Sequence, residues 1–109
     1  MATIRLVQGD TAPQLRLEFI DSYTGEPTNL QGATVTLHFR AVGSSTVLFS
    51  RNAIIISPAS NGVAVLAWNT GDLNQAAGDY EGEIEVQLSN GVRETQFDTL
   101  QFVLREDFA

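Results

Sequence analysis

The chain has 109 residues, of which 43% are hydrophobic and 17% charged, and this composition predicts one ordered domain with a single core. The 13 acidic residues outnumber the 6 basic ones, and the net charge of -7 argues against direct binding to nucleic acid or to an anionic membrane. There is no cysteine, which excludes disulfides and thiol chemistry. No stretch approaches the ~20 apolar residues of a membrane span, and the start lacks a secretory-signal pattern.

The first part of the chain predicts three strands, over residues 3–8, 13–21 and 33–40. In each of them apolar and polar side chains alternate, which is the pattern of a strand with one buried face. The alternation is cleanest where Val35, Leu37 and Phe39 share a face. Residues 21–32 are rich in Gly, Pro, Asn and Thr, and they predict a loop before that strand.

The middle of the chain contains an apolar run that one face of a strand cannot bury. Residues 46–51 and then 52–57 continue the strand pattern, and the second segment includes Ile54, Ile55 and Ile56 in succession. Because successive side chains of a strand point to opposite faces, these three cannot all reach one core. We therefore expect one of them to be exposed, or to lie at a bulge or an interface.

The second half predicts four further strands, over residues 62–68, 79–88, 92–97 and 100–105. The first of these is apolar on both faces, which favours a central or covered strand that buries Trp68. Residues 69–78 are too short for a packed helix and predict a corner that crosses between sheets. The Asn90-Gly91 pair predicts a tight hairpin turn.

Together these segments predict an all-β fold, namely an antiparallel immunoglobulin-like β-sandwich of about seven or eight strands. The whole chain, residues 1–109, is expected to form this single domain. A small closed barrel is the structural alternative. Any likeness to antibody domains concerns architecture only, because the buried cysteine pair of those domains is absent.

The polar residues predict little catalytic chemistry. His38 is the sole histidine, local spacing supplies no Ser or Cys partner, and one histidine cannot build a metal cluster. Glu81, Glu83 and Glu85 share one strand face at intervals of roughly 7 Å. They predict a solvated face paired with arginines, with a protein-binding face or an acid/base pair as alternatives. We predict no catalytic, cofactor or metal residues, and an enzyme would need a pocket that gathers His38 with two carboxylates.

Four motifs in order resemble the N-terminal immunoglobulin-like domain of the phage baseplate upper protein family. They are VQGDTAPQLRLEF (Val7 to Phe19), LQGATVTLHFR (Leu30 to Arg40), GVAVLAW (Gly62 to Trp68) with the turn that follows it, and GDYEGEIEVQLSNG (Gly78 to Gly91). The likeness covers about Val7 to Leu104, and its motifs are turn and core patterns. Members of this family usually continue into a fibrous shaft and a binding domain, whereas this sequence stops at Ala109. We therefore expect a small stand-alone version or a fragment.

The resemblance implies a structural protein of the phage particle, made in the cytoplasm of the host bacterium. Its expected role is to dock on a tail, baseplate or head structure and to position or connect other subunits. Its expected partners are other virion proteins and copies of itself, with no cofactor. The candidate interface residues are Ile54, Ile55, Ile56, Glu81, Glu83 and Glu85. The alternative is a carbohydrate- or cell-surface-binding module, which would need exposed aromatic rings, whereas Trp68 and Tyr80 are expected in the core.

Overall fold

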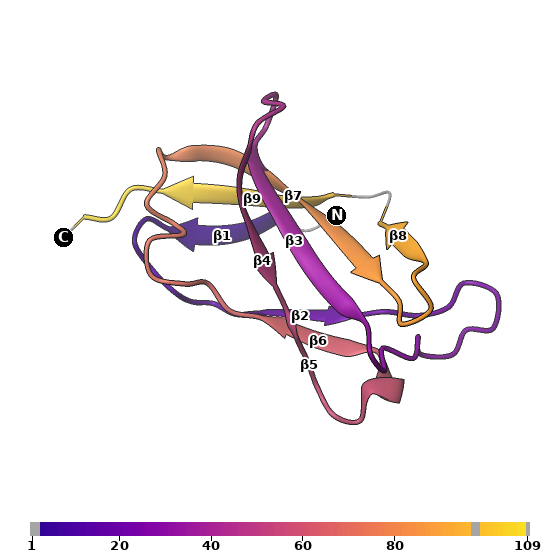
Figure 1. Ribbon diagram of the computed structural model, residues 1–109. Coiled ribbons are helices and arrows are strands. Elements are labelled where there is room, and N and C mark those ends of the chain that lie inside the picture. The colour runs from indigo at the N-terminus through magenta and orange to yellow at the C-terminus, as the bar shows by residue number, and fades with distance from the viewer. Residues whose placement is uncertain (1–2, 97–98, 109) are drawn as a thin grey trace.

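The computed structural model describes residues 3–96 and 99–108, and in it the chain folds into two facing sheets (Figure 1). The larger sheet has the order β1-β9-β7-β3-β4, with β8 also paired to β7, and the smaller has the order β2-β6-β5. The strands are β1 (Thr3–Val7), β2 (Leu15–Glu18), β3 (Thr34–Ala41), β4 (Val47–Asn52), β5 (Ile54–Ile55), β6 (Val63–Leu66), β7 (Gly78–Gln87), β8 (Arg93–Thr95) and β9 (Leu100–Arg105). The single helical element of the described residues is the 3-10 turn Ala59–Asn61.

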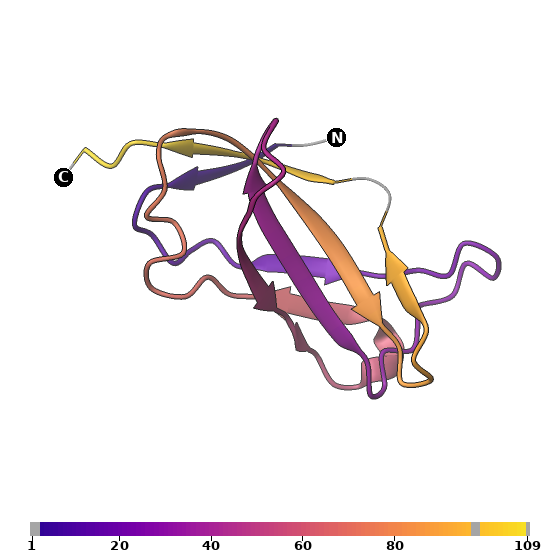
Figure 2. The same ribbon diagram turned by 45° about the horizontal axis from the view of Figure 1, so that its top comes forward.

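The predicted immunoglobulin-like β-sandwich is confirmed, and the closed barrel is not formed. Strands β2, β5 and β6 form the smaller sheet, while β3, β4, β7 and β9 belong to the larger one, which is the distribution of the immunoglobulin fold. Figure 2 shows the smaller sheet beneath the larger one.

Two details differ from the expected seven or eight antiparallel strands. The described residues form nine strands, because residues 46–57 divide into β4 and the two-residue β5. The pair β1 and β9 is parallel, which is possible because nearly the whole domain lies between these two strands. The predicted strand 92–97 is shorter, and residue 97 lies outside the described residues.

Aromatic side chains from both sheets fill the space between them. Phe39 is at the centre, with its ring centroid 5.1 Å from that of Tyr80, 5.2 Å from that of Phe102 and 5.7 Å from that of Trp68. Val35, Leu37 and Phe39 are buried on one face of β3, and Trp68 is only 3% exposed. The predicted core positions of β3, Trp68 and Tyr80 are therefore confirmed.

Hydrogen bonds from two buried aromatic side chains hold the corner between β6 and β7. Residues 69–77 form turns and a bend without a helix, and they carry the chain from the smaller sheet to the larger, as predicted. The Tyr80 hydroxyl donates a hydrogen bond to the Ala76 carbonyl, and Trp68 Nε1 donates to the Pro13 carbonyl at 2.9 Å. The first bond is a tyrosine corner, a device common in Greek-key sandwiches.

Candidate functional site

The three consecutive isoleucines lie on and beside the short edge strand β5. Ile54 is 67% exposed and Ile56 is 42% exposed, whereas Ile55 packs against the core. Two of the three side chains therefore point outward, where the sequence predicted one. The reason is strand alternation: Ile55 faces the core, so Ile54 and Ile56 share the opposite, outer face of the smaller sheet.

These isoleucines extend a longer apolar border of the sandwich. Backbone bonds from Ala53 N to the Val35 carbonyl, 2.8 Å, and from Ile56 N to the Val63 carbonyl, 2.9 Å, show the chain passing from the larger sheet to the smaller. We call residues 47–56 the β4–β5 edge. Its exposed apolar side chains are Val47, Leu48, Ile54 and Ile56.

The β4–β5 edge contains one charged residue, and that charge is compensated. Arg51 Nε donates to Asp72 Oδ2 at 3.0 Å, and Arg51 Nη2 donates to Asp72 Oδ1. Asp72 is only 7% exposed and also accepts from Asn69 N at 2.8 Å. No sequence pattern predicts this pair, because its members lie 21 residues apart on different elements. The edge therefore offers apolar contacts without a free charge.

The three predicted glutamates share the outer face of β7 and differ in their partners. Glu81 accepts from Arg40 Nε at 3.1 Å, and Glu85 lies 3.1 Å from His38 Nε2. Glu83 is exposed, and it stands opposite His38 in the β3–β7 register. The expected pairing with arginines thus holds for Glu81, and also for Glu85 through Arg93 at 3.9 Å.

His38 joins three strands through its ring. Its Nδ1 lies 2.6 Å from Ser50 Oγ on β4, and its Nε2 contacts Glu85 on β7. Local spacing could not predict the serine, because 12 residues separate it from His38 and the antiparallel β3–β4 register brings the two together.

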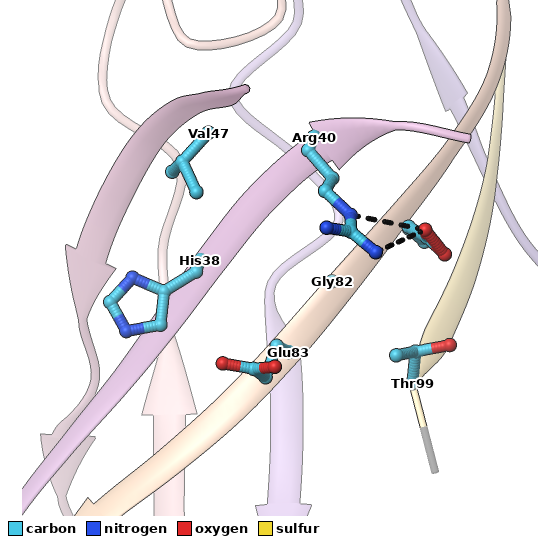
Figure 3. Close-up of a pocket in the computed structure, with 7 residues that line it drawn as sticks. His38, Arg40, Val47, Gly82, Glu83 and Thr99 are labelled. Atoms are coloured by element: carbon cyan, nitrogen blue, oxygen red, sulfur yellow. Dashed lines mark hydrogen bonds and ion pairs between the residues drawn. The ribbon is translucent and has the colours of Figure 1, made fainter. Parts of the chain in front are cut away.

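A hollow of about 270 Å³ lies over this outer face (Figure 3). It gathers His38 with Glu81 and Glu83, and Val47 and Thr99 complete its rim. In Figure 3 the dashed lines mark the bonds that Arg40 makes to Glu81. The hollow therefore meets the condition stated above for an enzyme, a pocket that gathers His38 with two carboxylates. Within it Arg40 bonds Glu81, and the two ring nitrogens of His38 contact Ser50 and Glu85, so these side chains also join neighbouring strands. The described residues include no group of three or more His, Asp or Glu side chains placed to hold a metal ion.

No protein-family model matches the chain, and no curated protein matches it either. Among solved structures, CopC from Methylosinus trichosporium OB3b is similar over 97% of this chain and 86% of its own, with 12% identity and a TM-score of 0.54. Murine CRIg is similar over 94% of this chain and 92% of its own, with 13% identity and a TM-score of 0.42. At such low identity, the likeness to CopC shows a shared sandwich fold alone. No helix in the described part of the chain has the length and apolar character to cross a membrane.

Proposed function

We propose that this chain is a structural module of a phage particle. It docks on a tail, baseplate or head structure and positions or connects other subunits, through contacts with other virion proteins and with copies of itself. The observation that carries this proposal is the apolar β4–β5 edge, whose exposed side chains have no cover within the described chain.

The β4–β5 edge is protected by the shortness of β5 and by the register shift near Val47, but not by a free charge. Unpaired edges associate with other chains unless charges, proline or bulges block them. At the opposite edge of the smaller sheet, β2 carries Arg16 and Glu18, both exposed. Along the β4–β5 edge the only charge is satisfied by Asp72, and the register of the β3–β4 ladder is irregular only near Val47. This edge is therefore suited to contact another chain through its exposed apolar side chains.

The resemblance of residues 7–104 to a phage baseplate protein domain supports the phage particle as the assembly in which such docking occurs. The motifs that carry it coincide with structural positions: LQGATVTLHFR covers most of β3, and GDYEGEIEVQLSNG covers β7 and its turn. A sandwich with an apolar edge suits a subunit that holds its neighbours by side-by-side contacts.

The burial of the large aromatic side chains disfavours the carbohydrate-binding alternative. Such a module needs rings presented on a face, whereas Trp68 lies in the core with its Nε1 bonded to the Pro13 carbonyl. The exposed rings of Tyr23 and Phe108 lie on a loop and on the C-terminal tail instead of on a sheet face.

Light scattering on a sizing column tests the edge as a contact between copies. We expect the wild-type chain to elute with a mass that is a multiple of 11.8 kDa, and Ile54→Asp to elute as a monomer, because a carboxylate would be buried in the contact. Val92→Asp is the matched control, since it adds the same charge at an exposed aliphatic residue of the β7–β8 turn. Equal masses for the wild type and Ile54→Asp would contradict the role of the edge. Ile55 is unsuitable for this test because it packs against the core.

A further inference from the structure

A larger cavity, of about 610 Å³, lies on the side of the sandwich opposite the β4–β5 edge. Its walls are the segment from Glu18 to Tyr23, the end of β7 at Val86, and β8 with Glu94. The two sides are opposite because β2 and β5 are the two outer strands of the smaller sheet. Both ribbon views place β8 beside the segment that follows β2 (Figures 1 and 2). We call this cavity the β2–β8 groove.

The β2–β8 groove begins at the end of β2, whose outer edge has no partner strand among the described residues. Immunoglobulin-type sheets carry a strand A beside strand B, whereas the smaller sheet here has only three strands, and β1 pairs with β9 instead. The backbone of Phe19 faces the β6 side, since its N–H donates to the Gly62 carbonyl at 2.8 Å and its carbonyl accepts from Thr28 N at 2.9 Å. By strand alternation, the backbone groups of Ile20 face the open side.

The walls of the groove combine apolar side chains with negative charge. Phe19, Val86 and Leu88 supply apolar surface, and Ile20 is largely exposed beside them. Three carboxylates, Glu18, Asp21 and Glu94, also line the groove, and no lysine or arginine does. Glu18 is paired with Arg16, and Asp21 Oδ1 accepts from Tyr23 N and Thr24 N, so Glu94 is the carboxylate that has no ion pair or side-chain hydrogen bond among the described residues. An occupant that complements this lining has an apolar face and positive charges.

We propose that the β2–β8 groove binds an extended segment of a different protein, in which apolar side chains alternate with arginine or lysine. Such a segment would pair with the open edge of β2, place its apolar face between the sheets and direct its cations to the carboxylates. A second copy of this chain is a poor occupant, because its net charge is -7 and its C-terminal tail carries Glu106 and Asp107. This inference rests on the proposed docking function and gives the chemistry of one partner.

A synthetic peptide of about ten residues, the length of a long strand, provides the probe. It alternates valine with arginine, has blocked ends and is titrated into the isotope-labelled full chain by amide NMR. We expect saturable shifts at Ile20, Val86 and Glu94. A peptide that alternates valine with glutamate is expected to produce none. The absence of saturable shifts, or shifts confined to residues outside the groove, would overturn the proposal.

A charge reversal separates groove binding from attraction to an acidic protein as a whole. Glu94→Arg should weaken binding of the basic peptide about fivefold or more, while Glu106→Arg, an exposed tail carboxylate with the same change in net charge, should not. Equal weakening by both variants would overturn the groove site. If the peptide fails to bind while the β4–β5 edge still assembles copies, only this inference falls. If the peptide binds but the wild-type chain elutes as a monomer, the edge contact between copies is rejected and the groove proposal stands.

Discussion

Asp72 and Tyr80 are polar side chains that are nearly buried and hydrogen-bonded. Such bonds contribute to the stability of a domain that has no disulfides. Asp72 is bonded to Arg51 and to Asn69 N, and Tyr80 is bonded to the Ala76 carbonyl. A buried polar group without a partner costs a large part of the small free energy that stabilises a domain. These bonds therefore fix the corner that carries the chain between the sheets.

Removal of the Arg51 guanidinium should lower the free energy of unfolding strongly, although the Arg51 side chain is itself partly exposed. Arg51→Met leaves the Asp72 carboxylate buried without its cation, and we expect a loss of about 3 kcal/mol in the free energy of unfolding. Urea titration followed by the fluorescence of Trp68 measures it. Arg16→Met, at an exposed ion pair, should change stability by no more than about 0.5 kcal/mol. Equal losses for the two variants would show that the Arg51–Asp72 bond does not stabilise the corner.

The strands differ in how far their sequence determined them. The expected strands at residues 33–40 and 79–88 match β3 and β7 closely, because one face of each is buried and the other polar, which fixes the period. The isoleucine run was ambiguous, since all three side chains are apolar and alternation within the run does not specify which of its two faces meets the core. The His38 contacts were also hidden, because Ser50 and Glu85 reach the ring only through strand register.

Gly82 is a position in β7 where packing against neighbouring strands leaves no room for a side chain. A methyl group at this position would lie 2.6 Å from Leu37 Cδ1 and 2.9 Å from Phe102 Cε2, both in the filled core. We expect Gly82→Ala to lower the free energy of unfolding by about 2 kcal/mol through overpacking, as measured by chemical denaturation. Gln87→Ala, an exposed change on the same strand, is the control. Unchanged stability of Gly82→Ala would show that the core can expand at this point.

At the scale of the whole molecule, the candidate contacts lie on opposite sides of one sandwich. The β4–β5 edge is apolar with its single charge compensated, and the β2–β8 groove is apolar with three carboxylates in its lining. Two unlike surfaces on opposite sides are what a connector needs, since it can bind copies of itself on one side and a different subunit on the other. From the net charge of -7 we expect no direct binding to nucleic acid or to anionic lipid.

The protein content of purified particles tests the proposed role most directly. If a phage encodes this chain, as proposed, its particles would be purified by density gradient, analysed by mass spectrometry and labelled with a gold-conjugated antibody against the chain. We predict that the chain is present in a fixed ratio to a tail or head subunit, that label gathers at one structure, and that Ile54→Asp particles lose it. Abundant chain in the infected-cell lysate and none in the purified particles would contradict the account.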